Sequence, residues 1–214
     1  MIAGLNLLFK DTGIRTDEMK GSVEDFMSAQ SEVNRLRREL ILQKCAKHPE
    51  LNQGGITHNT YRHIYFSDKH KLLYCFIPKV GCSNWKRVMM ILNGSKNKIS
   101  EMLPNEVHEY NGMKRLAELS GTEQQQKLQT YKKFVYVRNP FGRLLSAFNN
   151  KFGDVVDSLV EYPSKSNSHP TNSSAKMEKA FQDLPKDNLQ KLWKIYEKDF
   201  EIFDYPKPDF IEEY

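Results

Sequence analysis

Long apolar segments are missing from this sequence of 214 residues. No stretch approaches the roughly 18 consecutive apolar residues that a membrane-spanning helix requires. Residues 1–9 contain a short apolar patch, but they lack the basic segment and the cleavage site of a secretory leader. Association with a membrane is therefore expected only through an anchor that this sequence does not contain.

Cysteine is also scarce. The three cysteines are Cys45, Cys75 and Cys82, and their spacing matches no zinc-binding pattern. The sequence lacks the G-x-x-x-x-G-K-[ST] signature of ATP- and GTP-binding loops, and it shows no zinc-finger or aromatic RNA-binding pattern. We therefore predict no metal site, no nucleoside triphosphatase activity and no binding to nucleic acid.

The overall composition is that of an ordinary globular protein. Hydrophobic residues make up 39% of the chain and charged residues 28%, and the length suits one domain of moderate size. The formal net charge is +5. A basic surface of this kind suits anionic ligands, including phosphorylated small molecules and polyanionic glycans.

The most informative stretch covers residues 72–92. Its first six residues, 72–77, are apolar and rich in aromatic and branched side chains, which predicts a buried strand. Pro78 ends this strand, because proline has no N–H to donate to a neighbouring strand.

A short turn and a helix follow this strand. Lys79 and Gly81 lie in the turn, and Ser83 with Asn84 offers N-cap chemistry for the helix. The unpaired amides at the start of a helix, with a nearby lysine, favour an anion-binding site. An ordinary strand–helix turn with a solvent-exposed lysine fits this loop alone equally well.

A second stretch repeats the arrangement. Residues 134–137 are apolar and predict another short buried strand, which ends at Arg138. The helix that follows carries Ser146. Because ligands bind at the carboxyl ends of strands in open α/β sheets, Arg138 and Ser146 suit a second phosphate group.

These two stretches carry a family resemblance. Pro78–Lys86 reads PKVGCSNWK and Arg138–Phe148 reads RNPFGRLLSAF. Together they resemble the donor-binding motifs of the Golgi carbohydrate sulfotransferases, specifically the family that contains the chondroitin, dermatan and N-acetylgalactosamine 4-O-sulfotransferases. The sequence YEKDFEIFDY at residues 196–205 is also similar to the end of these proteins.

The resemblance implies a donor, an acceptor and a location. The donor is 3'-phosphoadenosine 5'-phosphosulfate, the acceptor is a chondroitin, dermatan or related glycan, and the enzymes of this family lie in the Golgi lumen. The first motif would bind the 5'-phosphosulfate and the second the 3'-phosphate. The residues implied in donor binding are Pro78, Lys79, Val80, Gly81, Cys82, Ser83, Asn84, Arg138, Asn139, Pro140, Phe141, Gly142, Arg143, Leu144, Leu145 and Ser146.

Two catalytic roles follow from the chemistry of sulfuryl transfer. Lys79 would neutralise charge on the leaving 5'-phosphate, and the backbone amides of residues 82–84 would surround that phosphate. A base must take the proton of the acceptor hydroxyl, and either His108 or Glu106 suits this role in a segment that is similar to an N-E-x-H segment of the family. No metal is required, because protein cations do the neutralising.

For the fold we expect the α/β class, with a P-loop-like sulfotransferase architecture: a parallel sheet flanked by helices, with a helical N-terminal extension. Residues 1–21 carry little pattern and are expected to be loose, and residues 22–214 would form one sulfotransferase-like domain. A helix is predicted from Ser22 to about Lys47, and a further amphipathic helix over residues 187–203.

The resemblance ends after Phe152. The related enzymes continue with a substantial central segment, whereas this chain has a polar stretch rich in proline, serine and asparagine, which predicts a flexible insert near residues 163–175. A shortened, non-catalytic relative that keeps the donor motifs is therefore the alternative to an active sulfotransferase.

Overall fold

The computed structural model describes residues 5–9, 23–52, 55–108, 112–159 and 173–211. The chain divides into two compact units, residues 1–137 and 138–214. Each contains one of the two motifs, and the two units are described in turn. Within the described ranges, no helix is long and apolar enough to cross a membrane.

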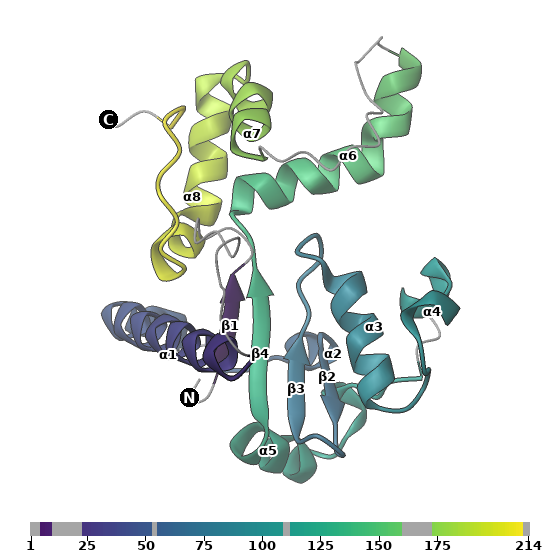
Figure 1. The fold of residues 1–214 in the computed structure, drawn as a ribbon. Coiled ribbons are helices and arrows are strands. Elements are labelled where there is room, and N and C mark those ends of the chain that lie inside the picture. Colours follow the sequence, from purple (N-terminus) through teal and green to yellow (C-terminus); the bar gives the residue numbers. More distant parts are fainter. Residues whose placement is uncertain (1–4, 10–22, 53–54, 109–111, 160–172, 212–214) are drawn as a thin grey trace. The chain divides into compact units, whose positions relative to one another are not determined.

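A four-stranded sheet forms the centre of the first unit (Figure 1). The strands lie in the order β1-β4-β3-β2. β4 pairs in parallel with both β1 and β3, whereas β2 pairs antiparallel with β3. The strand bounds are β1 Leu5–Phe9, β2 Ile64–Ser67, β3 Leu72–Cys75 and β4 Lys132–Val137.

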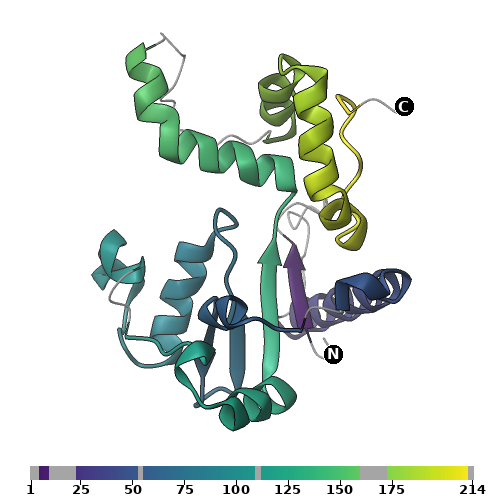
Figure 2. The same ribbon diagram turned by 180° about the vertical axis from the view of Figure 1, so that it is seen from behind.

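Helices and short 3-10 turns surround this sheet. Figures 1 and 2 show α5 beside the end of the sheet at which β4 begins. The bounds are α1 Val23–Lys47, η1 Pro49–Asn52, α2 His58–Arg62, α3 Cys82–Leu92, η2 Ile99–Glu101, α4 Pro104–His108, η3 Leu116–Glu118 and α5 Gly121–Thr130.

Alternating side chains of the strands bury both faces of this sheet. In β3, Tyr74 packs with α3 and α4 on one face, whereas Leu73 packs with η3 and α5 on the other. Tyr74 is fully buried and Leu73 is 2% exposed. Because both faces are covered, the sheet holds the carboxyl end of β3, from which the residues of the first motif continue.

The sheet confirms the predicted α/β class and corrects two details. The parallel arrangement holds for β1, β4 and β3, but β2 is antiparallel because residues 68–71 turn the chain directly back into β3. Residues 5–9 form a strand, although this part of the sequence was expected to be loose. Backbone pairing with β4 explains the difference, since such pairing does not depend on local sequence pattern.

The predicted N-terminal helix is present as α1. Its apolar positions, however, do not share one buried face. Ile41 is 5% exposed, whereas Phe26 is 43% and Leu36 is 52% exposed. The packing of α1 against β1 therefore involves a narrower strip of the helix than its sequence suggested.

The described residues of the second unit form three helices: α6 Pro140–Leu159, α7 Ser173–Gln182 and α8 Lys186–Ile202. Its core contains Phe141 of α6, Phe181 of α7 and Phe200 of α8, with Leu189 and Ile211. Phe141 is fully buried and stands at the centre, since its ring contacts Phe181 edge-on with the centroids 4.9 Å apart.

The predicted insert falls partly outside the described residues. Residues 163–172 are not among them, and α7 begins at Ser173, so residues 173–175 are helical rather than flexible. The predicted helix over 187–203 corresponds to α8, with bounds shifted by one residue at each end.

Candidate active site

The loop that follows β3 has an unusual backbone conformation. Lys79 adopts a φ of 67° and Gly81 a φ of 88°, so two of the three residues 79–81 are left-handed. Only glycine adopts this conformation without strain, and a lysine there costs free energy of the order of 1–3 kcal/mol. Strained backbone of this kind is one feature of ligand sites, and the anion-binding role of this loop stays a prediction.

Gly81 is the N-cap of α3, and no side chain caps this helix. The N-cap role expected for Ser83 and Asn84 is therefore wrong, because α3 begins at Cys82 and both residues lie inside it. A Cβ added at Gly81 would meet no atom of the chain within 4 Å, so its positive φ, rather than a crowded neighbour, explains the glycine.

The first turn of α3 offers two amides, not the three that the sequence suggested. The amides of Cys82 and Ser83 stand at the first two positions of the helix and have no intrahelical acceptor. The amide of Asn84 donates to the carbonyl of Gly81 at 3.1 Å. With the helix dipole, the two remaining donors form a favourable place for a phosphate or sulfate oxygen.

His108, a candidate base, lies beside this turn. Its Nε2 is 3.0 Å from the hydroxyl oxygen of Ser83. Its Nδ1 is 3.4 Å from Nζ of Lys86, one turn further along α3. The structure thus brings together two predicted site residues, His108 and Ser83, that lie 25 positions apart in the sequence.

Lys86 is a functional candidate that the sequence argument missed. Its side chain is buried, with 4% exposed, and its Nζ lies 4.2 Å from the ring centroid of Phe76. One signal for Lys86 was available in the sequence. It lies three residues after Ser83, and residues three apart share a helix face. Nothing in the local sequence indicated that this face would be buried.

Glu106, the other candidate base, is held by two partners. Its carboxylate accepts from the amide of Leu103 at 3.1 Å and pairs with Lys96 at 3.3 Å. The amide of Leu103, and then Lys96, lower the pKa of Glu106 below its ordinary value. A lower pKa makes Glu106 a weaker base, so the structure favours it as the catalytic base less than the sequence did.

The other residues of the first motif support the loop. Val80 is 2% exposed and anchors the turn, whereas Pro78 is exposed. The thiols of Cys75 and Cys82 are free. Burial raises the pKa of the Cys75 thiol to about 11, so Cys75 is a packing residue and not a nucleophile.

The second motif begins with a helix cap. The side-chain oxygen of Asn139 accepts from the amides of Phe141 at 3.0 Å and Gly142 at 3.2 Å. Pro140 occupies the first position of α6, where its missing N–H has no consequence. Asn139 and Pro140 were both predicted to bind the donor, and in the structure they start the helix. An Asn-Pro pair before an apolar stretch could have indicated this role.

Arg138 lies two residues before α6, and its side chain lies beside Gly142 in the first turn of the helix. A Cβ added at Gly142 would stand 3.5 Å from Nε of Arg138, so the guanidinium lies against the backbone at Gly142. Ser146 is four residues after Gly142 and therefore on the same side of the helix. The pairing of Arg138 and Ser146 around one phosphate stays a prediction.

Several other side chains of the second motif pack within the second unit. Phe141 is fully buried, and Leu144 with Leu145 packs against the same core. Arg143 pairs with Asp199 of α8 at 4.0 Å. A buried phenylalanine has no access to a ligand, so the donor-binding role predicted for Phe141 is not compatible with its position.

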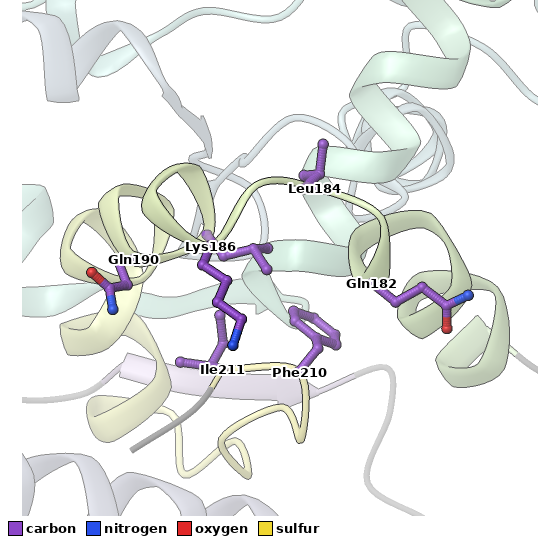
Figure 3. Close-up of a pocket in the computed structure, with 7 residues that line it drawn as sticks. Gln182, Leu184, Lys186, Gln190, Phe210 and Ile211 are labelled. Carbon is purple, nitrogen blue, oxygen red and sulfur yellow. The ribbon is translucent and has the colours of Figure 1, made fainter. Parts of the chain in front are cut away.

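A cavity of about 190 Å³ lies elsewhere in the second unit (Figure 3). Among the described residues, its lining contains none of the predicted site residues. It is lined by Gln182, Leu184, Lys186, Leu189, Gln190, Phe210 and Ile211. The described residues also contain no cluster of histidine, cysteine and acidic side chains suited to a metal ion.

Comparisons with known proteins point to one family. A model of the sulfotransferase family matches residues 62–157 and 154–206. Human carbohydrate sulfotransferase 9 is 40% identical over 127 residues, which cover 56% of this chain and 28% of that protein.

Two further relatives agree. Carbohydrate sulfotransferase 11 of Danio rerio is 36% identical over 63% of this chain and 40% of its own length. Human carbohydrate sulfotransferase 10 is 42% identical over 54% of this chain and 34% of its own length. The chain therefore spans well under half the length of the curated relatives it matches, and no solved structure shows significant similarity to it.

Proposed function

The chain belongs to the sulfotransferase family, and we propose that it moves a sulfuryl group from 3'-phosphoadenosine 5'-phosphosulfate to a hydroxyl group of a glycan. The observation that carries this proposal is the loop after β3, where left-handed Lys79 and Gly81 lead into the open first turn of α3. The names of the matched relatives support a carbohydrate as the acceptor.

The first motif is proposed to hold the 5'-phosphosulfate. The amides of Cys82 and Ser83 would donate to its oxygens, and the ammonium of Lys79 would neutralise charge as it develops on the leaving phosphate. The absence of a Cβ at Gly81 leaves space beside the loop, since no atom of the chain fills that position within 4 Å. When bound, the donor supplies the sulfuryl group; the protein supplies position and charge.

The second motif is proposed to hold the 3'-phosphate of the same donor. The guanidinium of Arg138 can form two parallel hydrogen bonds with a phosphate, and the hydroxyl of Ser146 can add a third. A 3'-phosphate is absent from ATP, so this pair would select the donor over common nucleotides. The placement of Arg138 against Gly142, on the face that carries Ser146, supports this assignment.

A polyanionic glycan such as chondroitin or dermatan is the proposed acceptor, and the Golgi lumen the proposed place of action. The net charge of +5 supports an anionic acceptor. The similarity of both motifs to those of Golgi enzymes supports the location.

The first test is a calorimetric titration of the whole chain with 3'-phosphoadenosine 5'-phosphate. We expect binding to the wild type and weaker binding to Lys79→Ala, because one charge-assisted contact is lost. The control is Lys98→Ala, which removes the same charge from an exposed position before η2. Equal binding by wild type and Lys79→Ala would contradict the proposed role of the loop.

Transfer itself is tested with radiolabelled donor and desulfated chondroitin. Incorporation of label that depends on both substrates is the expected result. Binding of the nucleotide without transfer to any glycan in a panel would instead identify a non-catalytic relative that retains the donor motifs. The two assays therefore separate the donor site from catalysis.

A further inference from the structure

A buried lysine inside the first unit has no role in the proposed chemistry. Lys86 is 4% exposed, and no ion pair among the described residues involves it. Its Nζ lies 4.2 Å from the ring centroid of Phe76 and 5.5 Å from that of Tyr65, distances at which a cation is attracted to an aromatic face. Its polar contact is Nδ1 of His108, at 3.4 Å.

This contact decides which nitrogen of His108 carries the proton. An ammonium group has three donors and no acceptor. Nδ1 of His108 must therefore accept from Lys86, and the proton of the neutral ring lies on Nε2. A proton on Nδ1 would point at the ammonium and would be repelled.

The proton on Nε2 in turn orients Ser83. In this tautomer, Nε2–H donates to the hydroxyl oxygen of Ser83, which lies 3.0 Å away. A hydroxyl that accepts from one side turns its own hydrogen elsewhere, and this hydrogen becomes available to an anion at the first turn of α3. The order of donation runs from Lys86 through His108 to Ser83.

Packing fixes part of this arrangement. Ser83 and Lys86 lie one turn apart on α3, and His108 is the last residue of α4. Val107, the neighbour of His108, is fully buried in the core shared by α3 and the sheet. Lys86 is therefore held by the core of the first unit, whereas His108 is exposed at the end of α4.

We propose that Lys86 and His108 are positioning residues that direct the Ser83 hydroxyl toward the bound donor. This inference rests on the proposed function for its ligand. It also gives His108 a role different from the base expected from the sequence, because both ring nitrogens of His108 already have hydrogen-bond partners in this arrangement.

The tautomer provides a test that needs no ligand. NMR spectra of the ¹⁵N-labelled histidine ring should show the proton of His108 on Nε2 in the wild type. In Lys86→Met this preference should be lost and a mixture of tautomers should appear. A ring of His108 with its proton on Nδ1, or an unchanged tautomer in Lys86→Met, would overturn the inference.

Titration with 3'-phosphoadenosine 5'-phosphate tests the effect on the donor. His108→Ala and Ser83→Ala should each weaken binding about two- to tenfold, the range for one hydrogen bond, and the double variant should be no weaker than either single one. The control is Lys96→Met, which removes a lysine that contacts α4 through Glu106 and should leave affinity unchanged.

His108→Gln separates positioning from base catalysis. A glutamine amide can still donate to Ser83. Donor affinity and the rate of sulfuryl transfer should therefore stay within about twofold of the wild type, a smaller change than the loss of one hydrogen bond would cause. Loss of transfer with unchanged donor affinity would instead identify His108 as the base. If the effects of His108→Ala and Ser83→Ala on donor affinity are additive, the contact between these residues has only a structural role, and the proposal is overturned.

Failure of the two proposals can be told apart. If the wild type binds no nucleotide, the proposed function fails, while the ring spectra still report the arrangement of Lys86, His108 and Ser83. If the nucleotide binds but the tautomer is wrong, only this inference fails.

Discussion

The two sequence motifs of this chain have similar lengths but use their residues differently. In the first motif, the loop and the first turn of α3 carry the polar groups of the proposed anion site: Lys79, the first amides of α3, and Ser83, whose hydroxyl lies 3.0 Å from Nε2 of His108. In the second motif, most side chains build the protein. Asn139 caps α6, and Phe141 fills the centre of the second core.

This difference shows that a binding motif is not a set of equivalent binding residues. The first motif depends on a particular backbone conformation, in which Lys79 and Gly81 are left-handed. The second motif needs a helix that starts at one place and packs on its core, with Arg138 beside its first turn and Ser146 one turn further along. Four substitutions test this contrast.

The largest expected effect is in the core of the second unit. Phe141→Ala should lower the free energy of unfolding by about 3–5 kcal/mol, because a fully buried aromatic side chain leaves a cavity. Phe148→Ala, at a position on α6 that is 48% exposed, should change it by less than about 0.5 kcal/mol. Urea unfolding followed by circular dichroism measures both, and similar losses would contradict the structural role of Phe141.

Next in size is the effect of Arg138 on the donor. Arg138→Ala should weaken binding of 3'-phosphoadenosine 5'-phosphate roughly ten- to a hundredfold, because a charge-assisted hydrogen bond contributes about 1.5–3 kcal/mol. Stability should be nearly unchanged. Arg62→Ala, which removes an exposed arginine of α2, serves as the control for net charge. Unchanged affinity in Arg138→Ala would refute the role of Arg138, and an equal loss in both variants would point to net charge alone.

The helix cap gives a smaller effect and compares the two motifs directly. Asn139→Ala should reduce the free energy of unfolding by about 1 kcal/mol, whereas Asn139→Asp should retain the cap. Asn84→Ala should cost less than about 0.5 kcal/mol, because Asn84 is exposed and does not cap α3. Thermal unfolding distinguishes these results, and a larger loss at Asn84 would reverse the comparison.

The smallest effect concerns the sheet beneath the first motif. The hydroxyl of Tyr74 is buried and has no hydrogen-bond partner among the described residues, and burial raises the pKa of Tyr74 above its ordinary range. Tyr74→Phe should therefore leave stability unchanged or raise it by up to about 1 kcal/mol.

Tyr65 provides the matched control for this substitution. Its hydroxyl accepts from Nη2 of Arg115 at 3.3 Å, so Tyr65→Phe should lower stability by about 0.5–1.5 kcal/mol. Both effects can be measured by urea unfolding. A greater loss in Tyr74→Phe than in Tyr65→Phe would mean that the Tyr74 hydroxyl has a partner in solution.

Much of the fold follows from local sequence pattern. The apolar stretch over 72–77 indicated β3, which ends at Cys75, and the pattern over 134–137 indicated β4, which begins two residues earlier. The helical spacing over 187–203 indicated α8. Strand β1 was not predicted, because it gains its partners from β4, more than 120 residues away, and not from its neighbours in the chain.

The site was predictable in part. The motifs identified Lys79, Gly81, Ser83 and Arg138, and the structure places them where a strand gives way to a helix. They did not separate binding residues from structural ones, since capping by Asn139 and burial of Phe141 depend on where the helix begins and on what it packs against.

By itself, then, the sequence determined the family, the order of the strands and helices around each motif, and the residue types available to bind an anion. These properties depend on short segments and on their chemical groups. Only the tertiary structure decided that Lys86 is buried, that its ammonium meets His108, and that His108 meets Ser83. The physical reason is distance along the chain: residues 22 and 25 positions apart come together through the packing of α4 on α3, which no local pattern specifies.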